Sequence, residues 1–307
     1  MERPITHIAI IGAGAVGGAY GAMLHDADPA SVSFVATGEH LCRLRDRGLV
    51  VNGKPYTIPV RDADDTSAPA DLVIVAVKHH QLDEALDEMR RSVGEETIIL
   101  SLMNGVESEE RIGRVYGDNH ILPAIVLGID AVRDGNRITY TRKGKICFGE
   151  AGTRPPGPRV RRVRALFARA AIPCETPPDM TRILWWKFMI NVGVNQVSAA
   201  LHARYGAFQA PGEARELMES AMREVVLLAS HLHISLTEAD ITGWYAVLGG
   251  LSPDASTSML QDVDARRKTE VEMFAGKVIE LGRRLGVATP VNERLFAMIR
   301  RIEDSYL

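Results

Sequence analysis

The sequence predicts an α/β domain with a parallel sheet, followed by an all-α domain. Three observations lead to this prediction. A β-rich apolar run breaks at a cluster of glycines near the start of the chain, apolar runs then alternate with helical segments, and beyond Pro177 nearly every segment has a helical period. The length of 307 residues also favours about two domains. We place the junction near Asp179, which gives domains of residues 1–179 and 180–307.

The stretch from Ile8 to Leu24 predicts a strand, a tight turn and a helix. Its glycines have G-x-G-x-x-G spacing, in which the first allows the turn, the second lets backbone approach a pyrophosphate, and the third lets helix and strand pack closely. The start of the helix presents unpaired N–H groups to an anion. These features predict a Rossmann-type dinucleotide site made by Gly12, Ala13, Gly14, Ala15, Val16 and Gly17. The stretch carries no charge, but its five glycines and marginal length argue against a membrane span.

The second predicted strand, residues 31–36, ends at Thr37. An NAD-selective enzyme usually places an acidic residue at this strand end to hold the ribose hydroxyls, whereas a small polar or basic residue leaves room for a 2′-phosphate. Thr37 therefore favours NADP(H). Glu39 lies close by, and no arginine directly follows the strand.

Two later apolar runs, residues 71–77 and 97–102, have the continuous hydrophobicity of parallel strands buried on both faces. Lys78 follows the first run and Asn104 follows the second. Because open α/β sheets bind ligands at the carboxyl ends of their strands, both residues are candidate cofactor contacts, and Asn104 is also a candidate substrate contact. The alternatives are an exposed lysine at a helix start and a plain Asn-Gly turn.

The other expected elements of this domain are shorter. We expect helices at residues 40–47, 79–91 and 159–170 and from 107–110 onward, a hairpin at 49–60, strands at 121–126, 138–140, 145–148 and 172–175, and a loop at 152–158.

Residues 181–201 predict one long helix that is apolar nearly all round and therefore buried. Lys187, Asn191 and Asn195 lie four residues apart in it, so they share one face. Each unpaired buried polar group would cost roughly 1–3 kcal/mol. The stripe therefore indicates a cavity that receives a ligand; the alternative is a hydrogen-bonded network between two helices.

Further helices are expected at residues 215–232 and from Ser235–Glu238, which has the Ser/Thr-x-x-Glu spacing of a helix start. Residues 256–262 open another long helix, whose apolar positions continue to Leu285. Glu270 borders its buried side. On spacing alone, an ion pair with Arg266 one turn earlier is the preferred interpretation.

The composition excludes several classes of protein. A formal net charge of −3 and a charged fraction of 24% give no sign of a nucleic-acid partner. The three cysteines, Cys42, Cys147 and Cys174, lack the spacing of a metal site or a disulfide framework, so we expect no metal and a reducing, cytoplasmic location. An apolar helical face can pack within the chain or against a second copy, so a homodimer stays open.

Taken together and in order, these motifs resemble the ketopantoate reductases, also called 2-dehydropantoate 2-reductases. The resemblance spans nearly the whole chain and rests on Gly12–Gly17, Val77-Lys78, Asn104-Gly105, Trp186-Lys187, Asn191, Asn195, Ser258–Asp262 and Thr269-Glu270.

The resemblance implies NADPH-dependent reduction of 2-dehydropantoate to (R)-pantoate in pantothenate and coenzyme A biosynthesis. It also implies an all-α second domain like that of 6-phosphogluconate dehydrogenase relatives. By the same resemblance Lys187 is the general acid and Glu270 orients it, while Asn104, Asn191, Asn195 and Ser258 hold the substrate. Lys78 would lie near the nicotinamide ribose or the substrate.

Three positions depart from the family pattern. Met103 replaces a common glutamine, Thr37 stands where an arginine often receives the 2′-phosphate, and Ala255 stands where an asparagine often binds the substrate's terminal hydroxyl. A different branched 2-oxo acid therefore remains an alternative substrate. A non-enzymatic alternative, an NADP-sensing homologue, would need the glycine turn but neither Lys187 nor Glu270.

Overall fold

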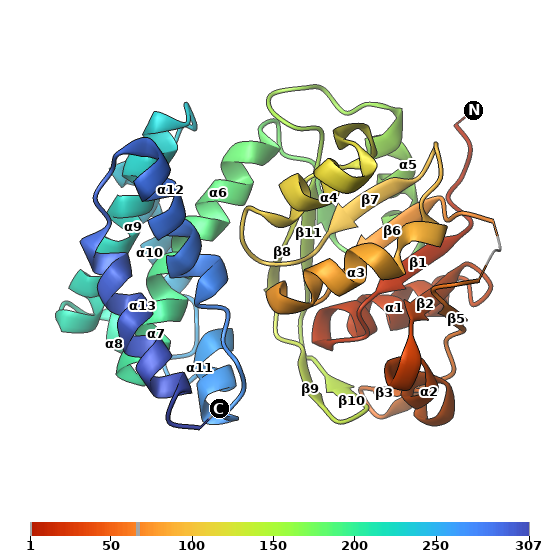
Figure 1. Ribbon diagram of the computed structural model, residues 1–307, viewed down its shortest axis with the longest axis horizontal. Coiled ribbons are helices and arrows are strands. Elements are labelled where there is room, and N and C mark those ends of the chain that lie inside the picture. The colour runs from red at the N-terminus through yellow and green to blue at the C-terminus, as the bar shows by residue number, and fades with distance from the viewer. Residues whose placement is uncertain (1, 66–67, 307) are drawn as a thin grey trace. The chain divides into compact units, whose positions relative to one another are not determined.

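The computed structural model describes residues 2–65 and 68–306. It divides into two compact units, Met1–Thr181 and Arg182–Leu307. The first is an α/β unit and the second is helical, which confirms the predicted fold class (Figure 1). Within the described residues, no helix combines the length and the hydropathy needed to cross a membrane.

The first unit is built on a five-stranded parallel sheet with the strand order β5-β2-β1-β6-β7. Such a sheet must be covered on both faces, because its strands carry apolar side chains on each side. Ile8 and Ile10 of β1 point into one apolar core and Ala9 and Ile11 into the other. The strands are β1 (Ile8–Ile11), β2 (Val32–Ala36), β5 (Val60–Asp62), β6 (Leu72–Val75) and β7 (Ile98–Ser101).

Helices cover the two faces of this sheet. One face packs against α1 (Ala15–Ala27) and α5 (Pro158–Arg169). The other packs against α3 (Leu82–Glu88) and α4 (Ser108–Tyr116), and α3 crosses in front of the sheet in Figure 1. The helix expected over residues 79–91 is thus shorter, because 3₁₀ turns η1 (His79–Gln81) and η2 (Arg90–Ser92) flank α3.

Two small sheets complete the first unit. Their strands are β3 (Leu49–Val51), β4 (Lys54–Tyr56), β9 (Val132–Asp134) and β10 (Arg137–Thr139) in one, and β8 (Ala124–Ile129), β11 (Lys143–Phe148) and β12 (Cys174–Glu175) in the other. The expected hairpin is present as β3 and β4, turning at Asn52 and Gly53, but the chain beyond it joins the main sheet as β5. The 3₁₀ turn η3 (Asp118–His120) precedes β8.

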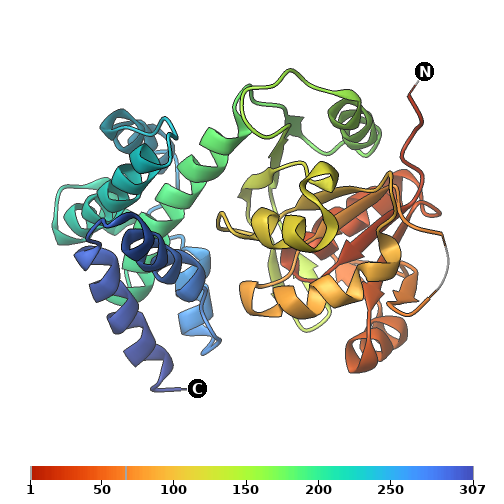
Figure 2. The same ribbon diagram turned by 45° about the horizontal axis from the view of Figure 1, so that its top comes forward.

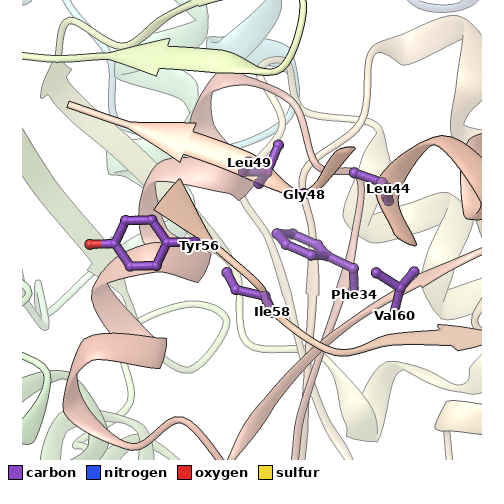
Figure 3. A pocket seen from close by; sticks show the side chains of 7 residues that line it. All are labelled: Phe34, Leu44, Gly48, Leu49, Tyr56, Ile58 and Val60. Carbon is purple, nitrogen blue, oxygen red and sulfur yellow. The ribbon is translucent and has the colours of Figure 1, made fainter. Parts of the chain in front are cut away.

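Helix α2 (Gly38–Arg47) follows β2 and packs through Leu41 and Leu44. A cavity of only about 10 Å³ remains where α2, β2 and the β3–β4 hairpin meet. Figure 3 shows its apolar lining, with the Tyr56 hydroxyl directed away from the other side chains. That hydroxyl donates to Asp26 Oδ2 at 2.7 Å. The cavity is a packing defect of the core, because it has room for no more than about one water molecule.

The second unit consists of helices in its described part (Figure 2). They are α6 (Met180–Ile190), η4 (Asn191–Asn195), α7 (Gln196–Leu201), α8 (Gly206–Gln209), α9 (Glu213–His231), α10 (Glu238–Leu248), α11 (Ser258–Asp264), η5 (Glu272–Gly276), α12 (Lys277–Leu285) and α13 (Pro290–Glu303). The π-helical turn η4 packs closely on α9 because Gly193 has no side chain. A Cβ there would lie 2.6 Å from Met222.

Three expectations for this unit are corrected. The long helix over 181–201 contains the π-helical turn η4 in its middle. The long helix expected from 256 onward ends at Asp264, since Arg266 adopts a left-handed φ of 50° and the Arg267 N–H returns to Asp262 O at 2.8 Å. The helix start at 235–238 is capped by Thr237 with Asp240, rather than by Ser235 with Glu238.

Candidate functional site

The glycine-rich turn between β1 and α1 is required by the fold itself at two positions. Gly12 has a φ of 98°, and a Cβ there would lie 2.6 Å from Ala76 O. A Cβ at Gly17 would lie 2.0 Å from Gly12 O, because α1 passes directly over the turn. Any side chain at either position would push helix and strand apart, as the spacing predicted.

Gly14 has a different role. It is the N-cap of α1, and a Cβ added there would meet nothing closer than Ala76 O at 3.8 Å. The fold therefore leaves space beside the start of α1, whose first turn contains Ala15 and Val16 and no acidic residue. A helix N-terminus with open backbone in front of it fits the pyrophosphate of a dinucleotide.

The other predicted cofactor residues lie at the same edge of the main sheet. The strands are parallel, with Ile11 opposite both Val35 and Val75, and Val75 opposite Ser101. The residues that follow them, among them Thr37, Lys78 and Asn104, are therefore brought to one edge with Gly12. Lys78 and Asn104 are both half-buried, and the Lys78 N–H donates to Gln81 Oε1 at 3.2 Å.

Two contacts that the sequence analysis missed hold the turns after β6 and β7. His79 and Glu107 pair across them, with Nε2 and Oε2 at 3.4 Å. The hydroxyls of Ser101 and Ser108 are 2.7 Å apart beneath the Met103–Asn104 turn. Two features of the sequence could have indicated these contacts. His79 directly follows Lys78, and Glu107 lies only three residues after Asn104. These contacts brace the segments that carry the candidate residues.

Thr37 meets a carboxylate that comes from another element. Its backbone N–H and its hydroxyl both donate to Glu88 Oε1 of α3, at 3.0 and 2.9 Å. Burial raises the pKa of Glu88, and repulsion from Glu84 raises it further. The end of β2 therefore has an acidic neighbour although the strand itself ends in threonine. Inspection of the strand end alone could not reveal a group contributed by residue 88.

In the second unit, Lys187 lies one turn before the π-helical turn η4, which contains Asn191 and Asn195. Lys187 and Asn191 are half-buried and Asn195 is buried. Asn195 Nδ2 donates to Asn191 Oδ1 at 3.1 Å. Asn191 Nδ2 is buried and has no hydrogen-bond partner among the described residues. An unsatisfied buried donor costs roughly 1–3 kcal/mol, so this atom indicates a missing acceptor.

A buried network joins η4 to η5. Gln196 Oε1 accepts the Ala275 N–H at 2.9 Å, while its Nε2 donates to Val192 O at 2.7 Å and to Asn292 Oδ1 at 3.0 Å. Asn292 Nδ2 in turn donates to Glu224 Oε2 at 2.7 Å. π-Helical turns of this kind are frequently found at functional sites. No hydrophobic periodicity in the sequence predicts a π-helical turn.

Ser258 lies on α11, which contacts η4. Glu270 lies just before η5, which also contacts η4. Ser258 is exposed at the first position of α11, which is capped by Thr257. Glu270 is buried, and the preceding Thr269 is anchored by two hydrogen bonds to Glu303 Oε1. The spacing argument for an Arg266–Glu270 pair is wrong, because no continuous helix joins these residues.

The structure thus gathers the predicted residues into two groups. The first unit holds Gly12–Gly17, Thr37, Lys78 and Asn104, and the second holds Lys187, Asn191, Asn195, Ser258 and Glu270. A Rossmann-type glycine turn on a parallel sheet is typical of dinucleotide-binding proteins. Together with a helical unit that carries a lysine one turn before two asparagines on a π-helical turn, it indicates the class of nicotinamide-dinucleotide-dependent oxidoreductases.

The chain belongs to the ketopantoate reductase family. Residues 8–153 match the family model "Ketopantoate reductase PanE/ApbA", and residues 179–303 match "Ketopantoate reductase PanE/ApbA C terminal". The 2-dehydropantoate 2-reductase of Aquifex aeolicus is 28% identical over 303 residues, covering 96% of each chain.

Solved structures agree. A PanE/ApbA family ketopantoate reductase from Ralstonia eutropha JMP134 is 27% identical with a TM-score of 0.83, covering 98% of this chain and 99% of that one. D-mandelate dehydrogenase, solved with NADH and anilino(oxo)acetate, gives a TM-score of 0.87 over the same shares at 22% identity. At that identity the likeness concerns the fold.

Proposed function

We propose that this protein reduces 2-dehydropantoate to (R)-pantoate with NADPH, and that Lys187 is its general acid. One observation carries the proposal: Lys187 lies one turn before Asn191, whose buried Nδ2 has no partner among the described residues. A substrate oxygen would satisfy this donor.

The chemistry follows from charge. A reduced nicotinamide, when bound, would supply the hydride to the carbonyl carbon. Negative charge then develops on the carbonyl oxygen, and Lys187 stabilises it and donates a proton to it, which yields the alcohol. A positioned acid of this kind contributes about 10² to 10⁴ in rate. Glu270, buried beside η5, is proposed to orient Lys187.

The amides and the serine are proposed to hold the substrate. Since Asn195 Nδ2 already donates to Asn191 Oδ1, Asn191 offers a donor and Asn195 offers its side-chain oxygen as an acceptor. This polarity fits a substrate that carries both acceptor and hydroxyl groups. Asn104 and Ser258 complete the proposed substrate set.

The cofactor is proposed to lie on residues 1–179 and the acid on residues 180–307. Gly14 leaves the backbone accessible for the pyrophosphate, and Gly12, Ala13, Ala15, Val16 and Gly17 form the surrounding turn. Thr37, Lys78 and Asn104, at the carboxyl edge of the sheet, are the proposed contacts to the riboses.

The proposal is tested by NADPH oxidation with 2-dehydropantoate and a panel of other 2-oxo acids. Wild-type protein should turn over 2-dehydropantoate, and Lys187→Ala should lower kcat by about 10² to 10⁴ while NADPH affinity is retained. The matched control is Lys268→Ala, an exposed lysine of the same unit that pairs with Glu272 at 3.4 Å. It should leave kcat unchanged.

Two results would redirect the assignment. Turnover of another branched 2-oxo acid in place of 2-dehydropantoate would keep the mechanism and change the substrate; the exposed Ala255, which has no amide to offer, is the observation that favours this second candidate. NADPH binding without oxidation of any acid would identify a sensor.

A further inference from the structure

Arg133 is a half-buried arginine beside the glycine turn. It extends from β9, where its Nε donates to Gly135 O at 2.8 Å and its Nη1 donates to Ala13 O. Both hydrogen-bond acceptors that Arg133 meets in the described part of the chain are backbone carbonyl oxygens. Carbonyl dipoles, rather than a carboxylate among these partners, therefore face the guanidinium charge. Burial lowers the pKa of Arg133, and the positive charge of Arg43 lowers it further.

A cavity of about 320 Å³ opens next to this guanidinium. Arg43 and Arg47 of α2 line it together with Arg133, Gly135 and Asn136. Asn136 Nδ2 donates to Arg47 O at 3.1 Å, which ties the β9–β10 turn to the end of α2. Three arginines around one cavity would suit an anion, because a guanidinium group can bind two phosphate oxygens at once.

The face of α2 that carries these arginines begins at the end of β2. His40, Arg43 and Arg47 are three and four residues apart and so share one side of the helix. Burial lowers the pKa of His40, the charges of Arg43 and Arg133 lower it further, and the charge of Glu84 opposes them. The cavity itself lies along the second half of this helix, where Arg43 and Arg47 line it.

The positions of Arg133 and of this α2 face indicate which phosphate of a bound dinucleotide the arginines would meet. In Rossmann-type domains the pyrophosphate lies at the first helix and the adenosine ribose lies at the end of the second strand. Arg133 contacts the first of these regions through Ala13 O, and the α2 face starts at the second. A phosphate on the ribose would therefore lie toward Arg43 and Arg133.

We propose that Arg133, with Arg43, binds the 2′-phosphate of NADPH and determines the preference of this protein for NADPH over NADH. This inference rests on the proposed function and names the residues that replace the arginine missing after β2. Glu88 opposes it, because a carboxylate at the end of β2 favours unphosphorylated ribose hydroxyls. However, Glu88 Oε1 already accepts two hydrogen bonds from Thr37.

The test is the binding of NADPH and NADH to the whole protein by calorimetry, without substrate. The wild type should bind NADPH more tightly. Arg133→Met should weaken NADPH binding about 10- to 100-fold, as for lost hydrogen bonds to a charged group, and leave NADH binding within about twofold. Arg43→Met, a change at an exposed position, should weaken NADPH binding in the same selective way. The matched control is Arg137→Met on the same hairpin; Arg137 is exposed and does not line the cavity.

Two outcomes overturn the proposal. Equal weakening of NADPH and NADH by Arg133→Met would assign the residue to the pyrophosphate or to support of the turn. Tighter NADH binding by the wild type, reversed in Glu88→Gln, would assign the preference to Glu88. Because no 2-oxo acid is present, failure of the proposed reaction would leave these binding results unaffected and is seen separately in the turnover assay.

Discussion

Gln196 Oε1 accepts the backbone N–H of Ala275 at 2.9 Å, across 79 residues of sequence. This hydrogen bond connects the two π-helical turns, because Gln196 directly follows η4 and Ala275 lies in η5. The same side chain donates to Val192 O within η4. Gln196 therefore sets how the turn with Asn191 and Asn195 lies against the turn that follows Glu270.

Gln196→Leu should destabilise the protein by about 2–6 kcal/mol, since it leaves the buried Ala275 N–H and Val192 O without this partner and each such group costs roughly 1–3 kcal/mol. Urea unfolding measures the change. Gln261→Leu is the control, because the side-chain amide of Gln261 makes a single long bond within the described residues, 3.4 Å to Ser256 O. If both variants lost the same free energy of unfolding, the hydrogen bonds of Gln196 would make no specific contribution to stability.

Gly14 and Gly17 should respond differently to alanine. Gly14→Ala adds a methyl group where the nearest atom is 3.8 Å away, so unfolding should be unchanged while NADPH binding weakens at least about tenfold through loss of close backbone approach. Gly17→Ala places its methyl group 2.0 Å from Gly12 O and should lower stability by several kcal/mol, roughly as for overpacking. Thermal unfolding and cofactor titration of both variants separate the effects; a stability loss in Gly14→Ala would contradict this division.

The elements that follow from local pattern could be predicted from the sequence. The glycine turn, the buried strands β6 and β7 and the change to helices are set by residues that are neighbours in the chain. Their hydrophobic period and turn residues reflect the local geometry directly. Hence Gly12, Lys78 and Asn104 could be assigned to strand ends without coordinates.

The features that escaped prediction depend on distant residues. The π-helical turn η4 is bonded to residues 275 and 292 through Gln196. The break after Asp264 is followed by Thr269, which Glu303 anchors. Glu88 reaches Thr37 from another helix, and Arg133 reaches Ala13 from another sheet. None of these distant partners produces a recognisable sequence pattern near the residue to which it bonds.

The stability of the protein should depend on pH through Glu88. Burial raises the pKa of this carboxyl above its ordinary value of 4.5. As the pH rises above 4.5, unfolded chains release this proton before folded ones, so the folded state binds more protons and loses stability with rising pH. Above the folded pKa the full destabilisation persists.

Glu88→Gln removes this ionisation and keeps an oxygen that can accept both bonds from Thr37. It should therefore raise the melting temperature at pH 7 by more than at pH 4. Glu96→Gln, at an exposed position of the same unit, should show no such difference. If Glu88→Gln is less stable than wild type at pH 7 and equal to it at pH 4, the charged form is favourable and the direction given for its pKa is wrong.

The last prediction concerns the position three residues before Ser258, where many family members carry an asparagine. Ala255 is exposed, and its backbone is fixed by bonds from its N–H to Ser252 O and from the Tyr205 N–H to its carbonyl, both 3.1 Å long. Ala255→Asn should therefore change stability by less than about 0.5 kcal/mol. If the protein acts on 2-dehydropantoate, the new amide should reach the terminal hydroxyl and lower KM about two- to tenfold, the range of one hydrogen bond. Trimethylpyruvate, which lacks that hydroxyl, should show no change, and neither substrate should respond to Ala265→Asn at the other end of α11. An unchanged or higher KM for 2-dehydropantoate alone would mean that the pocket near Ala255 is shaped for a different branched 2-oxo acid.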